Sequence, residues 1–165
     1  MSVYRNYVVF GTGARDSLTE ENSTRYHVYA LQITPSGVVS LWKNAVSGKD
    51  APIILNAGEK VWSAPLMDST GNICIATGQG YSDVGRPDLV RNSSKGRFMI
   101  ADRESGTITG SPITLGGAVV GGIDIENRHA YVITYDGTVV QIGGDDFSPS
   151  AVQGNPIKIL WWKKL

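Results

Sequence analysis

Short apolar runs alternate with polar turn residues along the whole chain, and hardly any stretch has the spacing of an amphipathic helix. The runs are rich in Val, Ile, Tyr and Trp and recur about every eight to fifteen residues, as in short antiparallel strands. Most of them are bounded by Gly, Asp, Asn, Ser or Pro, which favour tight turns. The pattern predicts strands at about 5–11, 26–33, 38–44, 60–67, 72–77, 96–102, 107–114, 119–125, 128–135, 138–143 and 156–163.

An internal repeat groups these strands into units. YVVFGTG and YHVYALQITPSGVVSLWKN align with NICIATG and GRFMIADRESGTITGSP, and a third copy reads HAYVITY and DGTVVQIGG. Repeated four-stranded meanders that each cover the next are typical of a β-propeller. We therefore predict an all-β fold, a partial β-propeller of about three four-stranded antiparallel blades in one domain, with blades at 1–50, 51–115 and 116–165.

The predicted propeller is incomplete. The first blade lacks its inner strand in this interpretation, because only Met1 to Tyr4 precede the first apolar run. Three blades are also fewer than the roughly four that closure requires, so unpaired edges should remain. Two explanations stay open: the chain is the C-terminal part of a larger propeller, which we favour, or a second copy pairs with the open edges in a homo-oligomer.

Two long polar connections stand out between the second and third strands of the first two units. They read ARDSLTEENSTR and QGYSDVGRPDLVRNSSK, whereas the third unit has only Asp-Gly at that place. Equivalent connections of successive blades emerge on one face, so both should lie on one rim and could bind a partner, although plain surface insertions are as good an explanation. The glycines before them, Gly11, Gly13, Gly78 and Gly80, predict backbone angles that other residues avoid. The candidate contact residues are Asp16, Glu20, Glu21, Tyr81, Asp83, Arg86 and Asp88.

Charge and composition argue against several classes of partner. Fifteen basic and fifteen acidic residues leave no net field to attract nucleic acid, and no apolar stretch is long enough to span a membrane. The single cysteine, Cys74, can form no internal disulfide and is predicted to pack as a small apolar side chain.

The sequence offers little catalytic chemistry. It has no phosphate-binding glycine loop, no G-x-S-x-G turn and no Cys/His cluster with metal-ligand spacing, so we predict no enzyme, no cofactor and no metal site. His27 and His129 are interpreted as strand-face residues, and Asp124 and Glu126 share one face of a strand with too few neighbours for calcium. In the pair Trp161–Trp162 we expect one indole in the core and the other against an adjoining blade or partner.

Several segments, in this order, resemble the C-terminal β-propeller of the type IV pilus biogenesis and tip-adhesin family (PilC/PilY-type). They are FGTG, a polar loop with Asp16, YHVYAL, GEKVWSAPLMDSTGNICIATG, RFMIADRESG and the terminal ILWWKKL. Gly58-Glu59-Lys60-Val61 stands where members carry Gly-Glu-Arg-Val, and the calcium loop of the family, D-x-D-x-D-G, does not occur. The resemblance implies a non-enzymatic interaction module at the cell surface or outside the cell, periplasmic in transit, whose partner is a pilus component or a host ligand.

The same strands also resemble the tryptophan-docking repeats of pyrroloquinoline-quinone (PQQ) propellers. ALQITPSGVVSLW keeps Ala30, Leu31, Gly37 and Trp42, whereas IADRESGTITG has Gly110 in place of the tryptophan. The resemblance implies a packing device in which the indole covers the neighbouring blade. It leaves two alternatives open: a fragment of a PQQ-dependent quinoprotein dehydrogenase, with quinone and Ca²⁺, or a periplasmic scaffold propeller for outer-membrane protein assembly.

Overall fold

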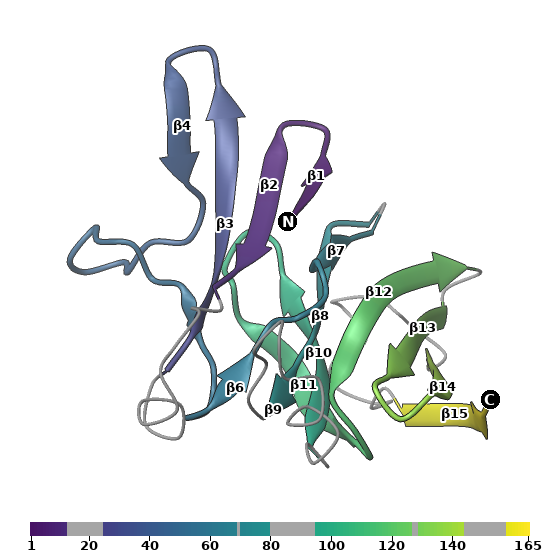
Figure 1. The fold of residues 1–165 in the computed structure, drawn as a ribbon. Helices are drawn as coiled ribbons and strands as arrows, with labels where there is room; N and C mark the ends of the chain where they lie inside the picture. Colours follow the sequence, from purple (N-terminus) through teal and green to yellow (C-terminus); the bar gives the residue numbers. More distant parts are fainter. Residues whose placement is uncertain (13–24, 69, 80–94, 127–128, 144–157) are drawn as a thin grey trace, which may run out of the picture.

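The regular elements of the computed structural model are all β-strands, as the alternation of apolar and polar residues predicts. The structure describes residues 1–12, 25–68, 70–79, 95–126, 129–143 and 158–165 (Figure 1). Within these ranges no helical segment has the length and hydrophobicity needed to cross a bilayer.

The described strands form three antiparallel meanders and one small ribbon. The first sheet has the order β1 (Ser2–Tyr4), β2 (Tyr7–Gly11), β3 (His27–Thr34) and β4 (Gly37–Ser40), with β5 (Ile53–Ile54) paired to β3. The second sheet has the order β7 (Leu66–Met67), β8 (Asn72–Ala76), β10 (Gly96–Asp102) and β11 (Ile108–Leu115). The third has β12 (Val119–Glu126), β13 (His129–Thr134), β14 (Thr138–Gly143) and β15 (Lys158–Lys164), while β6 (Glu59–Lys60) pairs with β9 (Gly78–Gln79).

The first sheet contains the inner strand that the sequence predicts to be missing. β1 pairs with β2 through Val3 and Val8, and the chain reverses at Arg5, whose φ of 52° is in the left-handed region. The strand predicted at 5–11 is observed as β2, but the prediction that no strand precedes it is wrong, because three residues are enough to form the first arm of a hairpin.

The predicted strand at 60–67 is also wrong in part. It consists of two short pieces in different sheets: β6 pairs with β9, and β7 pairs with β8. Residues 61–65 between them are not in a strand, and they include Pro65, which has no backbone N–H to give to a ladder. The chain uses this stretch to pass from the first sheet to the second.

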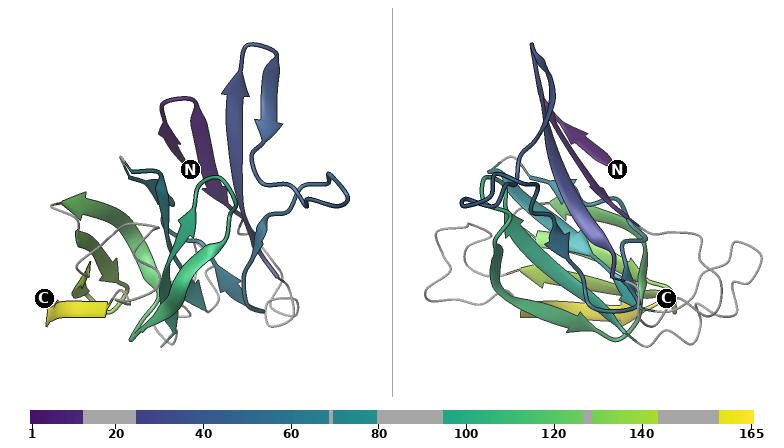
Figure 2. Two further views of the ribbon diagram at one scale, coloured as in Figure 1. Left: turned by 180° about the vertical axis from the view of Figure 1, so that it is seen from behind. Right: turned by 90° about the vertical axis from the view of Figure 1, so that its left-hand side faces the viewer.

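The second sheet is covered on both faces, and this explains its nearly continuous apolar strands. Ile73 and Ile75 of β8 pack in one core cluster with Val9 and Val28 of the first sheet. Their neighbours on β8, Cys74 among them, pack in a second cluster with the third sheet. Because side chains alternate between the two faces of a strand, a strand buried on both sides needs apolar residues throughout. The three sheets therefore follow one another in chain order as a stack (Figures 1 and 2).

Trp42 connects the first sheet to the second, as the tryptophan-docking resemblance implies. Its side chain is 2% exposed, and its indole Nε1–H donates to the carbonyl oxygen of Arg103 at 2.7 Å. Arg103 lies in the turn between β10 and β11, and Gly106 in the same turn lies under the ring. A methyl group on Gly106 would be 2.7 Å from the ring atom Cδ2 of Trp42, so the indole occupies the space that a side chain at position 106 would need.

A pair of glycine substitutions tests this packing. Gly106 and Gly110 have nearly the same φ, 70° and 69°, but no atom lies within 4 Å of a methyl group built on Gly110. We expect Gly110→Ala to lower the free energy of unfolding by about 1–2 kcal/mol, the cost of a left-handed φ. Gly106→Ala should lower it by about 1–3 kcal/mol more, because its methyl group also collides with Trp42. Urea denaturation would measure both, and equal losses would contradict the docking of the indole.

Candidate partner-binding rim

The connections between the second and third strands of all three sheets leave from the same end of the stack. In the first sheet this connection begins after Thr12 and returns at Arg25, and in the second it begins after Gln79 and returns at Lys95. In the third sheet it is the turn at 135–137. We call this end of the stack the loop rim, and we call the described residues on either side of each connection its feet. The loop rim lies along the lower side of Figure 1.

The feet of neighbouring sheets touch at glycines. A methyl group on Gly11 would lie 2.3 Å from Cβ of Val61, and one on Gly78 would lie 2.4 Å from Cβ of Ala118. Neither glycine has a positive φ, so the expectation of unusual backbone angles is wrong for these two, and the close approach of Val61 and Ala118 is the reason for glycine. Gly13 and Gly80 are outside the described residues.

The third sheet joins the loop rim through Gly117 and Ala118, which directly precede β12. Gly96 at the start of β10 lies against Gly117, whose carbonyl oxygen would be 2.2 Å from a methyl group on Gly96. The next residue, Ala118, accepts a hydrogen bond at 2.7 Å from the backbone N–H of Tyr135 in the third turn. The three connections therefore lie side by side at their feet, as the repeat predicts.

The foot of the first connection is held by hydrogen bonds. The N–H of Thr12 donates to the carbonyl of His27 at 2.8 Å, and the N–H of His27 donates to Oγ1 of Thr12 at 2.9 Å. Beyond this pair, the carbonyl of Tyr26 accepts from the N–H of Leu55 at 2.9 Å. The ladder of the sheet thus continues to the point where the connection begins.

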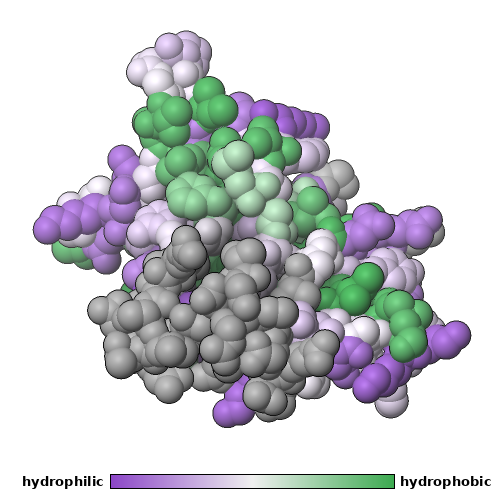
Figure 3. Space-filling model, viewed as in Figure 1, coloured by the Kyte–Doolittle hydropathy of each residue, from purple (hydrophilic) through white to green (hydrophobic). Residues whose placement is uncertain are grey.

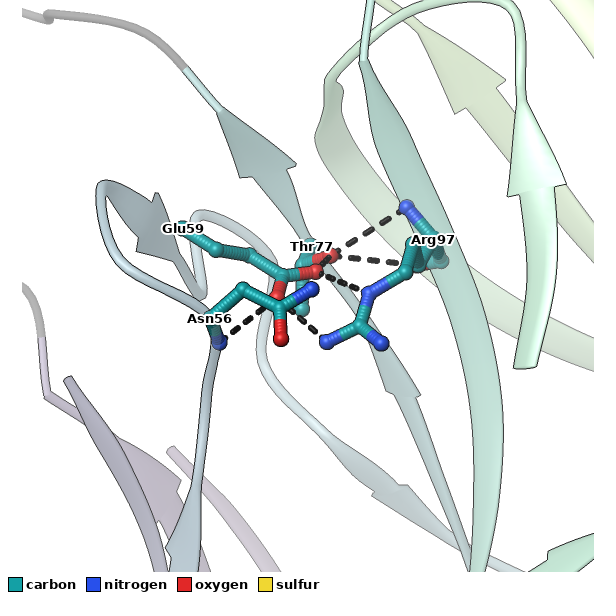
Figure 4. A network of polar contacts seen from close by, with 4 residues as sticks. All are labelled: Asn56, Glu59, Thr77 and Arg97. Atoms are coloured by element: carbon teal, nitrogen blue, oxygen red, sulfur yellow. Dashed lines mark hydrogen bonds and ion pairs between the residues drawn. The ribbon is translucent and has the colours of Figure 1, made fainter. Parts of the chain in front are cut away.

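The foot of the second connection is held by a buried carboxylate. Glu59, 3% exposed, accepts from Nε of Arg97 at 2.7 Å and from the backbone N–H of Asn56 at 3.0 Å (Figure 4). Nη2 of Arg97 and the hydroxyl of Thr77 also donate to this carboxylate. Both oxygens of Glu59 are therefore satisfied, and the Arg97 contact is a bidentate one that uses two guanidinium nitrogens.

This environment lowers the pKa of Glu59. Burial alone would raise the pKa, but the hydrogen bonds from Arg97, Thr77 and the Asn56 backbone favour the charged form and outweigh it. Glu59 is therefore an anion at neutral pH. It ties the segment before the second sheet to β10, directly behind the returning end of the second connection.

Lys60, the next residue, is buried on the other side of the same segment. Its side chain is 1% exposed, and its ammonium nitrogen lies 5.0 Å from the ring centre of Tyr26 and 5.6 Å from that of Trp62. Cations at this distance are attracted to the faces of aromatic rings. Glu59 thus holds the segment to the second sheet, while Lys60 holds it to Tyr26 at the foot of the first connection.

A pocket opens beside the buried carboxylate. It has a volume of about 250 Å³ and is lined by Asn56, Glu59, Lys95, Gly96, Arg97 and Thr114. The side chain of Arg97 is 25% exposed, so the guanidinium is accessible from this side while the carboxylate, at 4%, is not. The pocket therefore presents polar and cationic groups at the base of the second connection.

The candidate contact residues predicted from the sequence are not placed by the structure. Asp16, Glu20, Glu21, Tyr81, Asp83, Arg86 and Asp88 all lie in 13–24 and 80–94, outside the described residues. What the structure does place is the foot on either side of each connection. The sequence did not indicate Arg97 or the role of Glu59 at this place. The one available signal was the charged pair Glu59-Lys60, which lies between two apolar segments.

The other singled-out residues lie in strands. His27 is half-buried beside Tyr29, with ring centres 6.0 Å apart, and His129 packs against Gly143. Cys74 is fully buried, as predicted, and burial raises the pKa of its thiol far above the usual range. Among the described residues, no three His, Cys, Asp or Glu side chains are grouped so that they could hold a metal ion.

The expectation that one indole of the tryptophan pair lies in the core is wrong. Trp161 and Trp162 are 47% and 66% exposed, so neither indole is in the core. The reason is their position on β15, the last strand in the order of the third sheet.

Comparison with known proteins identifies no family. Neither a protein-family model nor a curated protein matches the chain.

The buried carboxylate predicts how stability depends on pH. The pKa of Glu59 in the folded chain lies below its ordinary value of 4.5. At pH values between these two pKa values, the unfolded chain therefore binds more protons than the folded chain. The stabilisation by Glu59 is therefore complete well above pH 4.5 and is lost as the pH falls through the lowered pKa. We expect Glu59→Gln to unfold about 2–3 kcal/mol more easily at pH 7 and to approach the wild type in acid.

Urea denaturation at several pH values would measure this difference. Glu104→Gln is the control, because Glu104 also pairs with an arginine, Arg103, but its side chain is 62% exposed. That substitution should cost about 0.5 kcal/mol or less. A constant difference between Glu59→Gln and the wild type at all pH values would contradict the assignment.

Proposed function

We propose that this chain is a non-enzymatic interaction module: a three-blade segment of a β-propeller in a type IV pilus-associated assembly factor or adhesin. It recognises a protein partner, a pilus component or a surface ligand, through the two long connections on the loop rim. The observation that carries the proposal is that the feet of both connections are side by side and fixed to one another.

Two separate segments of the family resemblance meet at this rim, which supports the proposal. The end of β2 carries Phe10-Gly11-Thr12, and the segment between the first two sheets carries Gly58-Glu59-Lys60-Val61. Gly11 and Val61 approach so closely that only a glycine fits at position 11. A contact between two motifs that are far apart in sequence is what a shared fold would produce.

The rigidity of the feet supports recognition by the two connections. Sheet hydrogen bonds hold Thr12, and the contacts of Glu59 and Arg97 hold the start of β10. Binding by loops costs less conformational entropy when a rigid scaffold fixes their ends. Asp16, Glu20 and Glu21 in the first connection would then offer negative charge, and Tyr81 and Arg86 in the second would offer the residue types that dominate binding hot spots.

Substitutions in the second connection test the proposal. We expect Tyr81→Ala and Arg86→Ala each to weaken binding to purified type IV pili about tenfold or more, since truncation at hot spots costs about 2 kcal/mol or more. Co-sedimentation with pili would measure the binding, and thermal denaturation would check that each variant remains folded.

Glu104→Ala is the control. Glu104 is exposed and lies in the turn between β10 and β11, at the end of the second sheet opposite to the loop rim. Its replacement should leave binding unchanged. Unchanged binding of both rim variants, or an equal loss with Glu104→Ala, would contradict recognition by the rim.

A further inference from the structure

The first sheet has an apolar outer face. Strand register places Val3, Val8 and Leu31 on the face opposite to Val9, which packs against the second sheet. Ile33 and Val38 form a pair on this same outer face and are 46% and 62% exposed, and Val3 is 61% exposed. Figure 3 shows hydrophobic residues gathered over this sheet. An exposed apolar face of this kind is typical of an interaction surface.

The outer face of the third sheet, at the opposite end of the stack, is mixed: it carries Ile133, Val139 and Trp161 together with Asp124, Glu126, Gln141 and Lys163. Val140 points toward the second sheet, so Gln141 and its register partner Trp161 point away from it. Ile133 pairs with Val139 on this outer face and is 45% exposed, while Trp161 is 47% exposed. In the described part of the chain, each end of the stack therefore presents one sheet face with exposed apolar side chains.

The contact between the first and second sheets shows how such faces are joined in this chain. Trp42 reaches forward from the first sheet onto Gly106, in the turn between the third and fourth strands of the second sheet. Trp161 also faces forward, away from the second sheet. Gly37, the first residue of β4, follows the corresponding turn of the first sheet, and no described atom is within 4 Å of a methyl group built on it. The third sheet thus carries an exposed indole on its outer face, and the first sheet carries a glycine against which no described residue packs.

Charges at the two ends are complementary. β12 begins at the loop rim and ends at Glu126, whose side chain is on the outer face and exposed. Arg5, also exposed, follows β1 at the end of the first sheet that is opposite to the loop rim, as Glu126 is in the third sheet. If the stack continued with its own geometry, Glu126 would lie over Arg5, a pairing of opposite charges that favours this orientation.

We propose that two copies of this chain associate head to tail, with the outer face of the third sheet of each copy covering the outer face of the first sheet of the other. Trp161 lies on the Gly37 turn of the partner, as Trp42 lies on Gly106. A head-to-tail contact closes into a ring when its rotation allows, and two copies would place six sheets around one axis, within the usual range of about four to eight for propellers. In this assembly a second copy of the chain, and not further blades of a longer propeller, covers the two outer faces. The assembly does not depend on what the loop rim binds.

Light scattering during size exclusion would test the assembly. At concentrations from about 1 µM to about 100 µM, a range that brackets a micromolar dissociation constant, we expect twice the chain mass at the upper end. A monomer throughout, or growth to ever larger species, would overturn the proposal. Pilus binding is measured separately, so failure of the dimer and failure of the proposed function are distinguishable.

Charged substitutions identify the faces. Val38→Glu and Trp161→Glu should each raise the dissociation constant at least about tenfold, because each would bury a carboxylate without a partner. Val46→Glu is the control: Val46 is 97% exposed in the segment after Trp42, outside both faces, and its substitution should have no effect. Circular dichroism checks folding, and Val38→Ser or Trp161→Gln replaces a glutamate variant that unfolds.

A mixture of two variants distinguishes head-to-tail association from pairing of like faces. The Val38→Glu chain keeps an intact third sheet, and the Trp161→Glu chain keeps an intact first sheet. Mixed in equal amounts, they can form one unaltered contact, so dimer should reappear although neither variant forms it alone. Dimer loss with Val38→Glu but not with Trp161→Glu would mean that first sheets pair with each other, and no recovery in the mixture would also overturn the proposal.

Discussion

The buried ion pair of Glu59 and Arg97 determines how the first two sheets are joined. Removing a carboxylate from water is costly, and the cost is offset only where several donors converge on it. Arg97, Thr77 and the Asn56 backbone converge in this way at one position of the segment that precedes the second sheet. A shift of that segment along the sheet would leave a buried charge without partners, so the contact selects one alignment of the chain.

The stack of sheets could be predicted from the sequence because burial on two faces leaves a strong pattern. Asn72–Ala76 reads as one apolar run apart from its first residue, and the strand observed there is fully buried. Gly96–Asp102 and Thr138–Gly143 have the predicted bounds for the same reason, since turn residues flank them. Hydrophobic alternation and turn chemistry are local properties, and they determine the strands, their order and the end of the stack from which the connections leave.

Contacts between sheets could not be predicted in the same way. The carboxylate of Glu59 and the guanidinium of Arg97 are 38 positions apart, and nothing local to either residue indicates the other. The close approach at Gly11 depends on Val61, and the exposure of Trp161 and Trp162 depends on their strand being outermost. The short strand β1 was missed because three residues carry almost no periodicity. The rim residues from Asp16 to Asp88 stay predictions.

The close contacts at the feet of the connections show which positions of the loop rim cannot be substituted. Gly11, Gly78 and Gly96 tolerate no larger side chain without movement of the neighbouring sheet, because Val61, Ala118 and Gly117 already occupy the space. The rim therefore has the properties of a scaffold for loop grafting: new connections of other lengths and sequences can be inserted between fixed ends, and the stack beneath them will keep its register.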